Sequence, residues 1–325
     1  MDDLLDDAIY RAGRTRPELP CLQVVTTRFN MVMRAFERDG FLSGAGDKEG
    51  WLAARIPIFE SVCLPSLVNQ SRRPDLWLLG FDLNREREVA PILDMIAPHP
   101  WIVPVWQKTQ EGRPDNFERC FRRSIVERLK PEHQWVLTTR LDNDDALSLT
   151  FCEAAREYTG AVISANPQDG DFWISFPLGV QFANGECRLM PQTGNAFLSR
   201  CVRVGAGSSV EWGTAQSGSH RHIFESGKVY LPVTRRPMWL QNVHGTNLLN
   251  REKTGLSVLR DTDAELARFG IQLESPSPQR SIRRTMLRVR QQPKFWKSIA
   301  RRVGDALRRM GLKDKRPPTP FKRSP

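Results

Sequence analysis

The sequence predicts an α/β protein in which a mostly parallel central sheet is covered by helices on both sides. Four short apolar runs alternate with segments whose apolar residues recur at helical spacing. This strand–helix alternation is typical of parallel sheets, and right-handed crossovers then fix the hand of the fold. The chain has 325 residues, of which 40% are hydrophobic and nine are tryptophan, so it can bury a sizeable core.

The first half of the chain supplies the strands and helices of this sheet. Apolar runs predict strands at 22–26, 76–81, 101–105 and 135–139. Helical spacing predicts helices at 51–67, 86–96 and 115–129. Pro57 and Pro65 divide the first of these helices into shorter pieces.

The second half has a different pattern, with short strands separated by Gly, Pro and Asn residues. Asn184-Gly185 is the strongest hairpin signal in the chain. The other predicted elements are a helix at 149–158, strands at 161–163, 194–199, 229–231 and 238–243, a mobile loop at 205–218 and a helix at 220–227. We expect this mixed C-terminal half to cover an edge of the sheet and to form an acceptor pocket.

The positive charge of the protein is concentrated at its C-terminal end. The net charge is +11, and residues 276–325 hold 16 Lys and Arg against Asp305 and Asp314, so the first 275 residues are slightly acidic. This asymmetry predicts a domain at 1–275 and a basic, partly disordered helical tail at 276–325.

The tail contains a second pattern, an apolar stripe on its predicted helix at 294–312. The stripe consists of Phe295, Ile299, Val303, Leu307 and Met310. A basic amphipathic helix of this kind is typical of segments that lie on an anionic membrane surface. A solvated tail, a helix packed on the domain and a nucleic-acid arm are the alternatives. Nucleic acid is the less favoured partner, because such an arm needs no continuous apolar stripe.

The cysteines and the N-terminal sequence indicate a cytoplasmic protein, peripheral on the inner membrane face if the tail binds there. The six cysteines are widely spaced and form no Cys-x-x-Cys pair, and we expect the four that lie within apolar or helical patterns to be reduced core residues. The chain begins with an acidic stretch where a signal peptide would be basic, and no run is expected to reach the length of a transmembrane helix.

An acidic cluster follows the fourth predicted strand. Asp142, Asp144 and Asp145 lie within four residues in Arg-Leu-Asp-Asn-Asp-Asp. Carboxylates this close raise one another's pKa unless a cation lies between them, and such oxygens suit Mg²⁺ or Mn²⁺ bound to a phosphate. The alternative is an exposed Asp/Asn turn.

Polar residues at other strand ends are candidates for the same site. An arginine at the carboxyl end of a strand, such as Arg28, can bind a phosphate, although a surface salt bridge explains it equally well. His244 follows the last predicted strand and precedes a glycine, which favours a ligand or acid–base role over an ordinary polar histidine only slightly. The sequence contains no Walker A loop and no G-x-G-x-x-G motif, which argues against P-loop kinases and dinucleotide oxidoreductases. A diphosphate leaving group held by a divalent cation is the simplest use of the cluster.

Several of these motifs together resemble the rhamnosyltransferase family of GT-A-type nucleotide-sugar glycosyltransferases. The matching residues are Thr27-Arg28-Phe29-Asn30, Arg55 with Ile58-Phe59-Glu60, Leu64-Pro65-Ser66-Leu67 with Gln70, and Arg140 to Leu147. The resemblance covers roughly residues 20–250, and the acidic motif is its most specific part. It implies a GT-A-like sheet with a D-x-D metal site.

The resemblance also implies roles for individual residues. Asp142 would face the nucleotide ribose or the metal, Asp144 would ligate Mn²⁺ or Mg²⁺, Asp145 would support the site or ligate, and His244 would complete it. The predicted donor-binding residues are Thr27, Arg28, Asp82, Arg140 and Asp142. The acidic pair that supplies the acceptor base in inverting members is not clearly present, and Glu211 and His220 are the nearest catalytic candidates.

The predicted function is transfer of a sugar from a nucleotide-sugar donor to a cell-surface polysaccharide or glycolipid precursor, with Mn²⁺ or Mg²⁺ as the cofactor. The family label indicates rhamnose, although few residues distinguish one hexose from another. The alternatives are a metal-dependent phosphohydrolase and a membrane- or nucleic-acid-binding protein in which the basic tail makes the contact.

Overall fold

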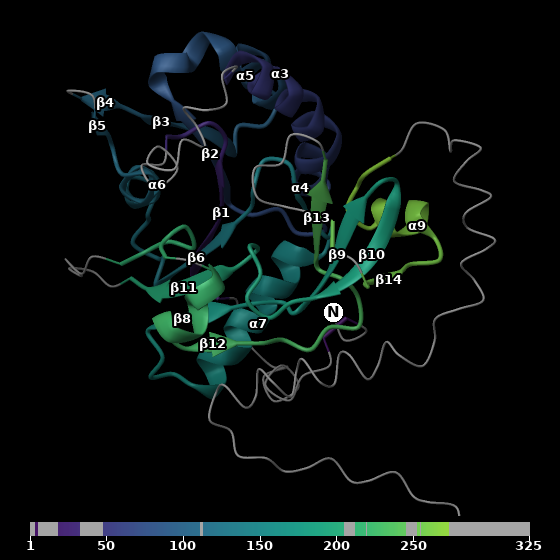
Figure 1. Ribbon diagram of the computed structural model, residues 1–325. Coiled ribbons are helices and arrows are strands. Elements are labelled where there is room, and N and C mark those ends of the chain that lie inside the picture. The colour runs from purple at the N-terminus through teal and green to yellow at the C-terminus, as the bar shows by residue number, and fades with distance from the viewer. Residues whose placement is uncertain are drawn as a thin grey trace, which may run out of the picture.

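The computed structural model describes residues 4–5, 19–32, 48–110, 113–204, 212–218, 220–244, 252–253 and 255–272 (Figure 1). The basic tail at 276–325 and the catalytic candidate Glu211 therefore lie outside the described residues. The predictions made for them stay predictions.

A seven-stranded sheet forms the centre of the protein, as the strand–helix alternation predicted. Its strand order is β12-β8-β11-β6-β1-β2-β3. The four predicted strands are confirmed as β1 (Cys21–Arg28), β2 (Leu76–Asp82), β3 (Ile102–Gln107) and β6 (Trp135–Arg140). Each of these strands runs parallel to its neighbours within the group, so their carboxyl ends meet at one edge of the sheet. The remaining strands are β8 (Asp171–Ile174), β11 (Ser199–Arg203) and β12 (Val229–Tyr230), and β11 pairs antiparallel with β6.

Helices cover both faces of this sheet, because its strands are apolar on both sides. Val25 and Leu79 face one core, which also contains residues of α3 (Lys48–Ile58), the π-helix Phe59–Cys63, α4 (Leu64–Val68), α5 (Ala90–Ile96) and α7 (Phe151–Ala165). Val24 and Leu78 face the opposite core, against α6 (Phe117–Val126). The alternation of these neighbours between two cores is the period-two pattern of a doubly buried strand.

A second, five-stranded sheet in the C-terminal half has the order β14-β10-β9-β13-β7 (Figure 1). Its strands are β7 (Ala146–Leu147), β9 (Leu178–Ala183), β10 (Glu186–Pro191), β13 (Trp239–Val243) and β14 (Ser257–Val258). The predicted hairpin joins β9 to β10, and Asn184 and Gly185 have φ angles of 51° and 76°, as a type I′ turn requires. Because β6 belongs to the first sheet and β7 to the second, the acidic cluster between them joins the two sheets.

Two of the predicted strands are wrong. Residues 161–163 continue α7, where Tyr158 and Val162 are buried on one helical face; a short apolar run does not by itself distinguish a strand from a buried helix. The strand predicted at 194–199 begins only at Ser199. The Asn195 side chain bonds the backbone there, donating to the Phe176 carbonyl at 2.9 Å, and this replaces strand pairing.

Within the described part of the chain, one helix, Gly50–Val68, is long and apolar enough to cross a membrane, with 19 residues and a mean hydropathy of 1.3. The expectation that no run reaches this length is therefore wrong. Its buried face packs in the main core, and Arg55 in its first half makes a buried ion pair with Asp144. These contacts make the helix part of the fold around the acidic cluster.

All six cysteines are buried and free, as expected of core residues. Burial raises the pKa of the Cys21 thiol to about 12 and that of the Cys63 thiol well above its usual range. Both are therefore neutral thiols packed as small apolar groups.

Candidate active site

The acidic turn, residues 142–145, is fixed by backbone contacts with the end of β1. The Leu141 N–H donates to the Thr26 carbonyl at 3.1 Å, and the Asn143 side chain donates to the Phe29 carbonyl at 2.9 Å. The Asp145 N–H closes the turn by donating to the Asp142 carbonyl at 3.3 Å. The carboxyl ends of β1 and β6 therefore position the aspartates together, as expected for an open parallel sheet.

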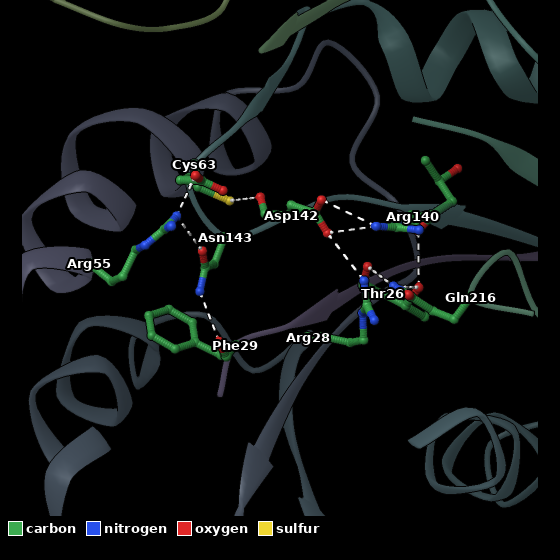
Figure 2. A network of polar contacts seen from close by, with 11 residues as sticks. Thr26, Arg28, Phe29, Arg55, Cys63, Arg140, Asp142, Asn143 and Gln216 are labelled. Carbon is green, nitrogen blue, oxygen red and sulfur yellow. Dashed lines mark hydrogen bonds and ion pairs between the residues drawn. The ribbon is translucent and has the colours of Figure 1, made fainter. Parts of the chain in front are cut away.

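Asp142 lies between two arginines that end neighbouring strands (Figure 2). Arg140 ends β6 and approaches the two carboxylate oxygens at 3.3 and 3.4 Å, and Arg28 ends β1 and lies 3.8 Å away. Burial by itself would raise the pKa of Asp142, but Arg140 and Arg28 outweigh burial and lower it. Burial and the charge of Arg140 lower the pKa of Arg28 to about 10, so the Arg28 guanidinium stays charged at neutral pH.

Asp144 forms a different pair of contacts, with Arg55 of α3 and with His244. The Arg55 guanidinium contacts the Asp144 carboxylate in a buried ion pair and also lies over the Trp51 ring at 5.0 Å. His244 directly follows β13, and its Nε2 lies 3.0 Å from Asp144 Oδ2. The structure therefore brings together two predicted site residues that are 100 positions apart in the sequence.

Asp145 ties the acidic turn to the second sheet. Its Oδ1 accepts the Asn242 N–H at 2.8 Å, two residues before His244. Among the described residues, its other oxygen has no hydrogen-bond partner. Burial, followed by the charges of Asp144 and Asp142, raises the pKa of Asp145 well above its usual range. This carboxyl group thus holds β13, and with it His244, against the turn.

The four predicted metal ligands do not form one complete protein site. Among the described residues, no three acidic, histidine or cysteine side chains are grouped closely enough to hold an ion. Asp144 and His244 lie close enough together that both could be ligands of a divalent cation whose other ligands are substrate oxygens and water, as is common for Mg²⁺. Ligand roles for Asp142 and Asp145 stay predictions.

Two of the predicted donor-binding residues have structural partners. The Thr27 hydroxyl is fully buried and accepts the Trp77 indole N–H at 2.9 Å, on the face of β1 opposite Arg28. Asp82 caps the 3-10 helix Leu83–Val89 by accepting the Asn84 N–H at 3.0 Å. The described contacts bring neither residue to the acidic turn, and their donor-binding roles stay predictions.

The described part of the predicted mobile loop, residues 212–218, is bonded to the same edge of the sheet. Gln216 donates from Nε2 to the Thr26 carbonyl at 3.0 Å (Figure 2). The Thr214 N–H and hydroxyl donate to the Glu118 carboxylate at 2.7 and 2.9 Å. Burial raises the pKa of Glu118, although the two bonds from Thr214 act against this rise.

The catalytic candidate His220 follows this segment in the 3-10 helix His220–His222. It is close enough to Asp142 to lower the pKa of that carboxyl group. The structure thus brings His220 near the acidic turn, whereas Glu211 lies outside the described residues.

The sequence interpretation did not assign site roles to Arg55 or Gln216. Arg55 was noted only in the family motif, yet it shares a helical face with Trp51 and Phe59 at a spacing of four residues. A charged residue on an apolar face is a signal of a buried partner, and that signal was available. Gln216 had no comparable signal, because its contacts depend on the path of a loop.

The sequence that holds these residues matches the model of a known protein family. The model described as "Putative rhamnosyl transferase" matches residues 26–256, which is more than two thirds of the chain. The chain belongs to this family. The rhamnosyl transferase match begins inside β1 and includes the acidic turn, Arg55 and His244. Membership confirms the resemblance carried by these motifs and indicates a glycosyltransferase.

Other comparisons add little to the family assignment. A search of curated proteins finds no match. Among solved structures, one similar chain is 4-diphosphocytidyl-2C-methyl-D-erythritol synthase from Anaerococcus prevotii, with 12% identity over 70% of this chain and 91% of that chain. Its TM-score of 0.28 is too low to support an argument about fold or function.

Proposed function

We propose that this member of the rhamnosyl transferase family transfers a sugar from a nucleotide-sugar donor at the edge formed by β1 and β6. One observation carries the proposal: the half-buried guanidiniums of Arg28 and Arg140 and the Asp144–His244 pair converge on one short turn. A diphosphate needs both kinds of group, cationic donors for its oxygens and a site for a divalent cation.

Arg28 and Arg140 would bind the diphosphate of the donor. Guanidiniums present planar pairs of N–H donors that match phosphate oxygens, and the low exposure of both side chains strengthens each contact. They would also stabilise the negative charge that develops on the diphosphate as the bond to the sugar breaks.

Asp144 and His244 would hold Mn²⁺ or Mg²⁺. A bound cation of this kind supplies Lewis-acid stabilisation of the leaving diphosphate. Arg55 orients Asp144 from the side of α3, and Asp145 orients His244 from the side of β13. Both contacts hold the pair before any substrate arrives, which lowers the reorganisation that binding would require.

His220 is the proposed base, with Glu211 as the second candidate. In its neutral form, the His220 imidazole can take the proton of an acceptor hydroxyl. The acceptor oxygen then bonds to the anomeric carbon, and the diphosphate leaves with the electron pair of the broken bond. His220→Ala would lower kcat by about 10²–10⁴-fold with little change in donor KM, if this residue is the base.

We further propose that the acceptor is a saccharide or glycolipid precursor at the inner face of the membrane. The basic apolar stripe at 294–312 supports this, because such a helix would keep the enzyme near a lipid-linked acceptor. The family name supports rhamnose as the sugar. Deleting residues 276–325 is expected to abolish binding to anionic liposomes while leaving soluble donor binding intact.

The decisive experiment incubates the protein with a panel of nucleotide sugars, Mn²⁺ and membrane-lipid extracts, and measures nucleotide release with and without the extracts. Release that requires both a particular donor and the extract is expected, with loss in Asp144→Ala. The matched control is Asp171→Ala, a surface carboxylate paired with Arg200. Release of inorganic phosphate without any acceptor would instead indicate a phosphohydrolase, and full activity of Asp144→Ala would refute the proposal.

A further inference from the structure

Arg28 and Arg140 both direct their guanidiniums at the same carboxylate, that of Asp142 (Figure 2). The exposed fractions of the two arginine side chains are only 16% and 13%. Their mutual repulsion contributes to the lowered pKa of Arg28. One monovalent carboxylate is thus placed where two half-buried cations meet.

The contacts that Asp142 makes with the two arginines are loose. They measure 3.3 to 3.8 Å, whereas a strong charge-assisted bond from a guanidinium to an oxyanion is about 2.7–2.9 Å. Among the described residues, the buried Nε of Arg140 has no hydrogen-bond partner. Arg140 therefore retains a donor that a larger anion would use.

Asp142 is also the most exposed of the three aspartates in the turn. Its side chain is 31% exposed, whereas that of Asp144 is 7% exposed and pairs with Arg55, and Asp145 is held by Asn242. The backbone of Asp142 is anchored separately, because its carbonyl accepts the Asp145 N–H at 3.3 Å. A rotation of its side chain would leave the turn intact.

We propose that Asp142 is an exchangeable counterion which occupies the diphosphate position between Arg28 and Arg140 and which the diphosphate displaces on binding. This inference rests on the proposed function, and it gives Asp142 a role other than the metal or ribose contact first expected. The displaced carboxylate competes with the ligand, which weakens donor binding and speeds release of the nucleoside diphosphate product. The arginine pair itself binds the anion without a divalent cation.

The test is isothermal titration of the full-length protein with inorganic pyrophosphate in EDTA. Wild type is expected to bind weakly, and Asp142→Asn to bind about tenfold more tightly, because a like-charge neighbour has been removed without a change in shape. The control is Glu252→Gln, which removes the negative charge that pairs with Arg188, an arginine on β10 with a similar exposed fraction. This substitution should leave the affinity for pyrophosphate unchanged. This control separates the local effect from a change in net charge.

Equal or weaker pyrophosphate binding by a folded Asp142→Asn protein would overturn the inference. If circular dichroism shows that this variant is unfolded, Arg140→Lys decides the question instead. Lysine keeps the positive charge but lacks the paired N–H donors of arginine. The affinity of the Arg140→Lys protein for pyrophosphate should therefore fall at least about fivefold. Unchanged affinity in Arg140→Lys would also overturn the inference.

The outcome is separable from that of the proposed function. Tighter pyrophosphate binding by Asp142→Asn without sugar transfer from any donor would keep the counterion role and reject the glycosyltransferase proposal. Sugar transfer combined with weaker binding by Asp142→Asn would reject the counterion role alone.

Discussion

Replacing Arg55 by methionine tests whether the acidic turn depends on a buried charge from α3. The Arg55 and Asp144 side chains are 5% and 7% exposed, so the substitution leaves a buried carboxylate without its guanidinium. Breaking a buried ion pair on one side costs about 3–5 kcal/mol. His244 stays 3.0 Å from Asp144, so we expect a cost at the lower end of this range. Loss of the contact between Arg55 and the Trp51 ring adds about 0.5–1 kcal/mol. We expect the free energy of unfolding to fall by about 3–4 kcal/mol.

The assay is urea unfolding followed by circular dichroism, with a double-mutant cycle. The double mutant Arg55→Met, Asp144→Asn leaves neither charge of this ion pair buried. It should therefore be at least about 1 kcal/mol more stable than the sum of the two single-mutant effects predicts. The control is Arg85→Met, which removes a half-buried partner of Glu88 and should cost less than about 1 kcal/mol. If Arg55→Met is no more destabilising than Arg85→Met, the reasoning about this ion pair is refuted.

Three further predictions concern packing, pH and metal binding. Gly179→Ala should lower the unfolding free energy by about 1–3 kcal/mol in urea unfolding, because a Cβ would lie 2.1 Å from the Trp239 ring; Gly170→Ala, whose nearest contact would be 4.0 Å, should change it little. The pKa of Glu118 is raised in the folded state, so the folded protein keeps this proton to higher pH than the unfolded chain, and stability is lost as pH rises from about 4.3 through the raised pKa. Glu118→Gln should remove this part of the decline of Tm with pH. An unchanged slope of Tm against pH in this variant would contradict the prediction. Mn²⁺ should raise the Tm of wild type and not that of Asp144→Asn; equal shifts would contradict ligation by Asp144.

Much of the sheet was predictable because β1, β2 and β6 are buried on both faces and the edge strand β3 is largely apolar. Such strands form continuous apolar runs, and their polar ends mark the edge where the site lies. The strand predicted at 161–163 failed because its apolar residues lie on the buried face of α7, a distinction that depends on packing. The helix α9 (Thr262–Ala267) was also missed, since six residues are too few for a clear period.

The site was predictable in its residues and less so in their partners. The sequence identified Asp142, Asp144 and His244, and the structure confirms that Asp144 and His244 lie together. The contact of Arg28 and Arg140 with one carboxylate depends on the register of β1 against β6, in which Thr26 is opposite Arg140. Register is fixed by the whole packed sheet, so local sequence does not reveal it.

The most direct measurement for the account is a crystal structure of the protein with a nucleoside diphosphate and Mn²⁺. The account predicts the diphosphate between Arg28 and Arg140, Asp142 rotated away from them, and Mn²⁺ bound by Asp144 and His244. A diphosphate bound away from the carboxyl ends of β1 and β6, or one bound there with Mn²⁺ held by neither Asp144 nor His244, would contradict it.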